Sequence, residues 1–138
     1  MTAHVVYPAW DDRQPATFSP IIMNDVLRNS LHFEGLIMSD DLEMQAIDQE
    51  LEDIPVLGTQ AGIDLFLICH DLEKVSSLQD AMIRDIETEK IPKTQIEQSL
   101  ARIFKVKEKI TAQKNSDFEK ILNENQSLAQ EMQAFLKD

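Results

Sequence analysis

The stretch Leu36-Ile37-Met38-Ser39-Asp40-Asp41 decides the fold class, because a short apolar run ends abruptly in polar residues. Such a run, preceded by Gly35, is typical of a strand that is buried on both faces of a parallel sheet. Ile63 to Cys69 is a second run of this kind and follows Gly62. Parallel neighbours need crossover connections, for which helices are the usual solution. We therefore assign the chain to the α/β class.

The segments on both sides of these runs alternate between strand and helix patterns. Residues 1–7 have a strand pattern, residues 8–18 have the composition of a loop, and Ser19-Pro20 supplies a cap and a first-turn proline for a helix. Apolar residues at helical spacing then predict five helical segments, at 44–54, 56–61, 72–86, 93–110 and 116–135. Pro55 separates the first two segments, and Asp71 is a candidate cap for the third. Three strand–helix units and a separable amphipathic tail are expected.

Composition excludes several classes of partner. The 138 residues include 25 acidic and 13 basic side chains, and a formal charge of -12 would repel nucleic acid and anionic lipid. A single cysteine, Cys69, excludes an internal disulfide, and no Cys/His cluster has the spacing of a zinc site. The apolar stretches fall far short of the ~18 residues of a membrane helix. We expect neither nucleic acid nor a membrane as a partner, and no metal site.

Polar residues at the ends of the expected strands are the candidates for chemistry, because reactive groups of parallel α/β proteins gather at the carboxyl edge. These residues are His4, Asp40 with Asp41, and His70. Asp40 follows a buried strand directly, so its carboxylate would be held rigidly as a nucleophile or base. The alternative is that Ser39 or Asp40 only caps the next helix.

The residues around Asp40 closely resemble the nucleophile segment of family 3 glycoside hydrolases, in which the aspartate after a serine attacks the sugar. Leu36 to Met44 carry this resemblance. Residues 1–9, 15–17 and 19–20 look like the preceding strand and helix of the β-N-acetylglucosaminidase (β-N-acetylhexosaminidase) branch, and residues 61–65 look like the start of its last barrel strand. Several separate motifs in order, up to about residue 110, make the resemblance specific.

The resemblance implies a retaining enzyme that cleaves terminal β-linked N-acetylglucosamine, as in peptidoglycan turnover, through a glycosyl-enzyme intermediate on Asp40. It implies that residues 1–113 are the last three βα units of a (β/α)8 barrel, and that the helical tail, residues 114–138, leads toward a second domain. It implies a carbohydrate substrate and no cofactor. We expect the first five units upstream of Met1 in a longer parent protein.

The sequence departs from the family pattern in substitutions and in absences. Ser30 stands where a charged or amide residue is usual, and Glu43 stands where a small residue is usual, which leaves substrate preference open. The Lys-His segment and the Asp-x-His dyad of the branch are missing, so only the nucleophile can be named. The competing interpretation is a truncated, inactive half-barrel that associates with itself or with the missing half, since a three-stranded sheet leaves its edges open.

Other residues near the strand ends receive weaker assignments. His4 is expected to line the sugar site or, equally, to bond a neighbouring loop, whereas His70 is expected to be a loop residue. Cys69 fits a small buried hydrophobic residue. Tyr7 and Trp10 could stack on a sugar ring or pack locally, and the sequence assigns them no role. Residues 1–7 lack a signal-peptide pattern, so the polypeptide is expected in the cytoplasm if made as given, while a longer parent could be secreted.

Overall fold

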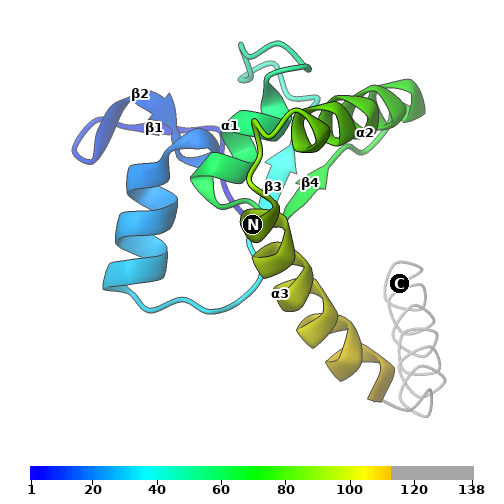
Figure 1. The fold of residues 1–138 in the computed structure, drawn as a ribbon. Coiled ribbons are helices and arrows are strands. Elements are labelled where there is room, and N and C mark those ends of the chain that lie inside the picture. Colours follow the sequence, from blue (N-terminus) through cyan, green and yellow to red (C-terminus); the bar gives the residue numbers. More distant parts are fainter. Residues whose placement is uncertain (113–138) are drawn as a thin grey trace, which may run out of the picture. The chain divides into compact units, whose positions relative to one another are not determined.

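The computed structural model describes residues 1–112, and Figure 1 shows their elements. In chain order these are β1 (Val6–Tyr7), β2 (Asp11–Pro15), the 3-10 turn η1 (Ala16–Phe18), the π-helical η2 (Ile21–Ser30), β3 (Met38–Asp41), α1 (Ile54–Ala61), β4 (Leu65–Leu67), α2 (Leu72–Glu87) and α3 (Lys93–Ala112). Contacts divide the chain into two units, Met1–Val106 and Lys107–Asp138. The tail helix expected at 116–135 lies outside the described residues.

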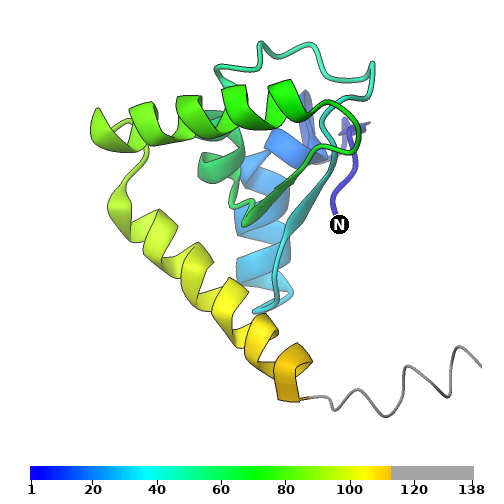
Figure 2. The ribbon, with the colours of Figure 1, turned by 90° about the vertical axis from the view of Figure 1, so that its right-hand side faces the viewer.

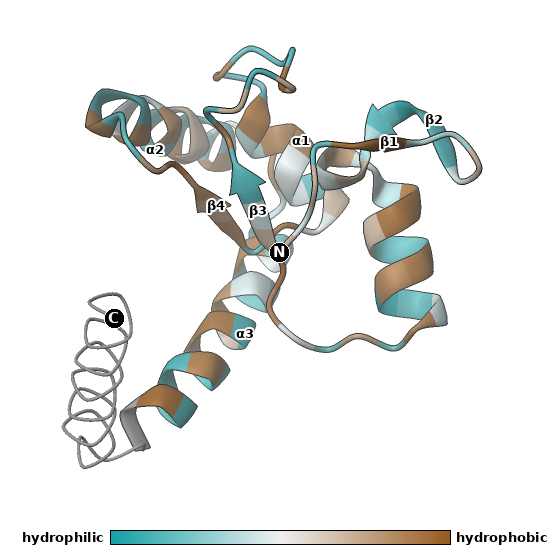
Figure 3. Ribbon diagram, turned by 180° about the vertical axis from the view of Figure 1, so that it is seen from behind, coloured by the Kyte–Doolittle hydropathy of each residue, from teal (hydrophilic) through white to brown (hydrophobic). Residues whose placement is uncertain are grey.

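The parallel pairing of the two apolar runs is confirmed. β3 pairs with β4 in parallel, with Met38 opposite Leu65 and Asp41 opposite Leu67. Helix α1 lies between them in the sequence, so these elements form one βαβ unit. The first strand lies further along the chain than its apolar run, because β3 begins at Met38 and continues through Ser39 and Asp40 to Asp41. The second strand, β4, is shorter than its run and covers only Leu65–Leu67. The residues of β4 are half-buried and not fully buried as expected, although its apolar character is plain in Figure 3.

The expectation of a third parallel strand at residues 1–7 is wrong. Only Val6–Tyr7 is a strand, and it pairs antiparallel with β2, inside the segment that was expected to be a loop. The described chain therefore has two separate two-stranded sheets. The reason is a tight turn that reverses the chain after Tyr7, closed by the Trp10 N–H on the Tyr7 carbonyl at 2.9 Å. The preceding residues still run beside β3, since the Thr2 N–H donates to the Met38 carbonyl at 2.8 Å.

The helix expected at 44–54 is also absent, and residues 42–53 form turns and bends. Like charges four residues apart, at Asp48 and Glu52, oppose a helix here. Pro55 lies in the first turn of α1, where a missing N–H has no cost, so it begins a helix and does not interrupt one. The acidic side chains of this segment consequently lie on a loop.

The helices expected after Asp71 and Pro92 are confirmed as α2 and α3. The Asp71 carboxylate accepts the N–H groups of Glu73 and Lys74 at 2.9 and 3.2 Å, as an N-cap does. Within residues 1–112, no helix is both long and apolar enough to cross a membrane.

Two apolar clusters form the core of this unit, and Phe66 of β4 packs against both. One cluster centres on Ile22 and Ile37, the other on Phe18 and Ile54. Figure 1 shows η2 and α2 on different sides of the β3–β4 pair. Packing against these two clusters therefore fixes the positions of β3 and β4.

A buried ionic cluster connects the starts of both strands to the helices. The Asp64 carboxylate accepts hydrogen bonds from Arg28 at 2.9 Å, Arg102 at 3.0 Å, Ser99 at 2.7 Å and the Ile37 N–H at 2.8 Å. We call these residues the Asp64 cluster. Since they come from η2, α3 and the residues before β3 and β4, the cluster fixes the ends of the strands that are opposite to Asp40 and Asp41.

Candidate active site

The candidate site lies where β3 and β4 end. Between the paired positions Met38 and Asp41, β3 contains one residue more than β4 does between Leu65 and Leu67, which is a β-bulge. At the bulge a side chain replaces a backbone acceptor, because Ser39 Oγ accepts the Leu67 N–H at 2.8 Å. Bulges of this kind redirect side chains and are frequent next to active sites. The bulge therefore sets the direction of the Asp40 side chain.

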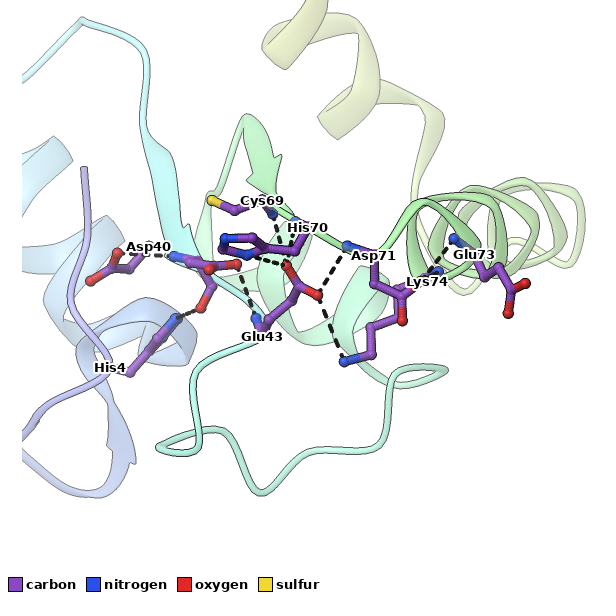
Figure 4. A network of polar contacts seen from close by, with 9 residues as sticks. His4, Asp40, Glu43, Cys69, His70, Asp71, Glu73 and Lys74 are labelled. Carbon is purple, nitrogen blue, oxygen red and sulfur yellow. Dashed lines mark hydrogen bonds and ion pairs between the residues drawn. The ribbon is translucent and has the colours of Figure 1, made fainter.

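Asp40 is held through its backbone and through one carboxylate oxygen. Its N–H donates to Thr2 Oγ1 at 3.2 Å, and its Oδ1 accepts the Asp41 N–H at 2.9 Å. Within residues 1–112 the second oxygen, Oδ2, accepts no hydrogen bond, and Figure 4 shows the carboxylate pointing away from Glu43. The carboxylate is oriented and keeps one oxygen free for another group.

The interpretation of Ser39 or Asp40 as a helix cap is wrong, because turns follow β3 and Ser39 bonds across to β4. The capping interaction in this region belongs to Asp41, whose Oδ1 accepts the Glu43 N–H at 3.1 Å in a local turn. Asp40 is thus inside the strand, and its neighbour Asp41 is the last residue of β3. The role of Asp40 as a nucleophile stays a prediction.

His4 is buried, and both of its ring nitrogens have partners in this unit. Nε2 lies 3.0 Å from the Asp41 carbonyl and Nδ1 lies 2.9 Å from Thr17 Oγ1. The ring also stacks on Phe18, with 6.3 Å between the centroids. These contacts tie the N-terminal segment to the end of β3 beside Asp40. Contact between His4 and a sugar stays a prediction.

Glu43 links the loop after β3 to the loop after β4, which the sequence did not reveal. Its carboxylate accepts the N–H groups of Cys69 at 3.0 Å, His70 at 2.7 Å and Asp71 at 3.2 Å, and Lys74 Nζ lies 3.9 Å away (Figure 4). We call this arrangement the Glu43 clasp. No local pattern predicts it, because its donors are backbone groups about 26 residues further on.

The clasp keeps Glu43 ionised. Desolvation raises the pKa of its carboxyl group, but the hydrogen bonds from the His70 and Cys69 N–H groups and from the His70 side chain outweigh this effect, so the pKa lies below its ordinary value. A charged carboxylate is the stronger acceptor, which favours the closed clasp at neutral pH.

Three side chains at this rim have the donor atoms of a metal site. Ligand atoms of Asp41, Glu43 and His70 all lie within 4.8 Å of one another. Both oxygens of Glu43, however, already accept backbone hydrogen bonds, and the clasp would have to open to free them. The geometry therefore favours a structural use of this carboxylate over metal binding.

Two residues of the loop after β4, Cys69 and His70, are exposed to solvent. Cys69 is exposed, so its expected burial is wrong. Desolvation and the nearby Asp41 carboxylate raise the pKa of its thiol, which makes it a weak nucleophile at neutral pH. His70 is an exposed loop residue before the Asp71 cap, as expected, and its Nδ1 lies 3.3 Å from Glu43 Oε2.

Comparison with known proteins gives consistent matches to one family. Residues 1–106 match the family described as the N-terminal domain of glycosyl hydrolase family 3. A β-hexosaminidase of Idiomarina loihiensis is 40% identical over 91 residues, which are 64% of this chain and 27% of that protein. The solved β-N-acetylglucosaminidase of Thermotoga maritima is similar with a TM-score of 0.72 at 34% identity, over 76% of this chain and 24% of its own.

A second solved structure agrees with the first. The family 3 β-N-acetylglucosaminidase of Paenibacillus sp. str. FPU-7 is similar with a TM-score of 0.75 at 33% identity, over 78% of this chain and 21% of its own. The chain thus spans about a quarter of the length of the relatives that it matches.

Proposed function

Because the chain belongs to glycosyl hydrolase family 3, we propose that it supplies the nucleophile of a retaining β-N-acetylglucosaminidase, and that this nucleophile is Asp40. One observation carries the proposal. Asp40 sits at a bulge at the carboxyl end of a parallel strand, with Oδ1 bonded to the Asp41 N–H and Oδ2 without a hydrogen-bond partner in residues 1–112. Attack on a sugar carbon requires a carboxylate that is held in one orientation and still has an oxygen without a hydrogen bond.

In this mechanism Asp40 attacks the anomeric carbon and the bond to the leaving oxygen breaks, so a glycosyl-enzyme ester forms. A second group protonates the leaving oxygen, and then removes a proton from the water that hydrolyses the ester. The Asp41 N–H donates to Oδ1 of Asp40 and so orients the carboxylate, which leaves Oδ2 as the oxygen that attacks.

The second group is proposed to lie on polypeptide outside these 138 residues. The three histidines, His4, His32 and His70, stand in no Asp-x-His arrangement. We therefore expect the chain alone to be inactive and the complete site to need a complementary segment. In this proposal residues 1–113 belong to the C-terminal part of a barrel, which includes the β3–α1–β4 unit, and residues 114–138 lead toward a second domain.

The proposed substrate is a β-linked N-acetylglucosamine unit of the cell-wall type. Relatives of this chain carry the names β-hexosaminidase and β-N-acetylglucosaminidase, which supports the amino-sugar class. The formal charge of -12 favours a neutral sugar over a strongly anionic one.

A second candidate function is a non-catalytic association partner. Apolar side chains on the described helices are exposed, among them Leu72 on α2 and Phe104 on α3. Exposed apolar surface of this kind marks an interface. The two candidates differ in whether a complemented chain turns over substrate.

The test compares the chain alone with the chain co-expressed with the part of a family 3 relative that precedes the matched region. Alone, it should not hydrolyse an aryl β-N-acetylglucosaminide above a blank. Complemented, it should accumulate label on Asp40 with a fluorosugar that forms the intermediate fast and releases it slowly. Asp40→Asn should remove about two to four orders of magnitude of turnover with little change in sugar binding.

Asp41→Asn is the matched control, because the Asp41 carboxylate accepts the Glu43 N–H and should stay unlabelled. Label on Asp41, or near-full turnover by the Asp40→Asn variant, would show that the nucleophile is misplaced. Turnover by the pure isolated chain that is lost in Asp40→Asn would show that this chain also supplies the proton.

A further inference from the structure

Tyr7 and Trp10 form a pair of exposed aromatic rings at the tip of the β1–β2 hairpin. Their centroids lie 6.3 Å apart with the planes tilted by 40°. Tyr7 is 44% and Trp10 56% exposed, although aromatic side chains of this size are normally much more buried. Each ring therefore has surface that no described residue covers, and neither takes part in the contacts around Asp40.

The pair is held in place by a short, well-anchored turn. Pro8 fixes one backbone angle, and the Trp10 N–H closes the turn on the Tyr7 carbonyl at 2.9 Å. The Asp11 carboxylate then accepts the Arg13 N–H at 3.0 Å and the Ser19 hydroxyl at 2.6 Å, which joins the hairpin to the start of η2. Little conformational freedom would be lost when a ligand covers the rings.

The hairpin lies at the end of the unit toward which β3 points, as the views in Figures 1 and 2 agree. The link to the candidate site is short. His4 Nε2 is 3.0 Å from the Asp41 carbonyl, and Tyr7 is three residues from His4, a span of at most roughly 11 Å. An oligosaccharide with one ring at Asp40 could place a further ring on the hairpin.

We propose that Tyr7 and Trp10 form an aromatic platform that binds a second sugar ring of a β-linked N-acetylglucosamine chain, on the leaving-group side of the bond cleaved at Asp40. The inference rests on the proposed function for the position of the first ring. The C–H face of a pyranose ring is apolar and stacks on the π face of indole and phenol rings. Asp11 and Asp12 follow Trp10 directly, and their charges favour a neutral ring over an acidic one.

The test uses Trp10 as its own reporter, because it is the one tryptophan in the sequence. The full chain is titrated with triacetylchitotriose while tryptophan emission is recorded. A saturable change with a Kd on the order of millimolar is expected. Tyr7→Ala should weaken this binding about three- to tenfold. Phe104→Ala, which removes an equally exposed ring on α3, should leave it unchanged.

Trp10→Ala removes the fluorescent reporter, so this variant needs a second measurement. Saturation-transfer NMR should detect sugar contact with the wild-type chain and lose most of it with Trp10→Ala. A titration in which Trp10 emission does not respond, or responds equally in Tyr7→Ala, would overturn the platform. An emission shift that depends on protein concentration and ignores the sugar would overturn it in favour of an interface with a second copy.

The platform and the nucleophile fail separately. The titration reports on Trp10 and the labelling reports on Asp40, so a normal titration with no label on Asp40 refutes only the proposed function. Label on Asp40 in the complemented protein, together with a silent titration, refutes only the platform.

Discussion

Replacing Asp64 by asparagine removes one negative charge from the centre of the Asp64 cluster with almost no change in volume. The Asp64 side chain is 0% exposed and lies 2.9 Å from Arg28 and 3.0 Å from Arg102. Removal of one partner from a buried ion pair costs about 3–5 kcal/mol, because the other charge stays uncompensated. Here two arginines remain. Desolvation and then the charge of Arg102 lower the pKa of Arg28, so the two cations already oppose each other.

We expect Asp64→Asn to lower the free energy of unfolding by about 3 kcal/mol. This is the lower end of the range, because the Arg28 and Arg102 side chains are 15% and 26% exposed and keep some water. The corresponding fall in Tm is about 10 °C. Urea unfolding followed by far-UV circular dichroism, at equal protein concentrations, measures the change. Asp80→Asn is the control, since Asp80 is an exposed aspartate on α2.

A double-mutant cycle isolates the ionic contribution. Arg102→Gln in the Asp64→Asn background should cost less than in the wild type, because it removes one of the two uncompensated charges. Additive losses, or an Asp64→Asn variant as stable as the Asp80→Asn control, would refute the reasoning that charge balance at Asp64 holds the helices to the strand starts.

Three further predictions concern the loops and the surface. Glu43→Gln should speed amide hydrogen exchange at Cys69 to Asp71 by about tenfold or more, while Glu73→Gln should not, because within residues 1–112 only Glu43 accepts from these N–H groups. The Ser19 hydroxyl, and after it the Arg13 N–H, lower the pKa of Asp11 from its ordinary value of 3.8. Ionised Asp11 therefore stabilises the folded state fully above pH 3.8, and this stabilisation is lost as the pH falls through the lower pKa that Asp11 has in the folded protein. Urea midpoints of the wild type and Asp11→Asn should therefore converge in acid. The exposed apolar residues of α2 and α3 should make the isolated chain self-associate or bind a hydrophobic dye, and a monodisperse monomer with a sharp melt and no dye binding would contradict this.

Local patterns determined the parts of this protein whose structure depends on neighbours in the sequence. The apolar runs predicted β3 and β4 and their parallel pairing, and the cap at Asp71 and the apolar period predicted α2 and α3. Asp40 was expected directly after a strand at 36–38, and the structure instead places it inside β3, one residue before the strand ends. Each of these signals lies within one turn or one strand of the residue concerned.

Contacts between distant segments decided the rest. Residues 42–53 have helical apolar spacing but form turns, since Asp48 and Glu52 repel along a helix and the apolar side chains reach the second core cluster without one. The Glu43 clasp and the Asp64 cluster join groups 26 to 38 residues apart, and backbone donors carry no sequence signature. The bulge that directs Asp40 exists only because β3 pairs with β4 and Ser39 replaces a backbone partner. A side chain's surroundings in the tertiary structure, more than its type, therefore decide which acidic residues are structural and which carboxylate is left free.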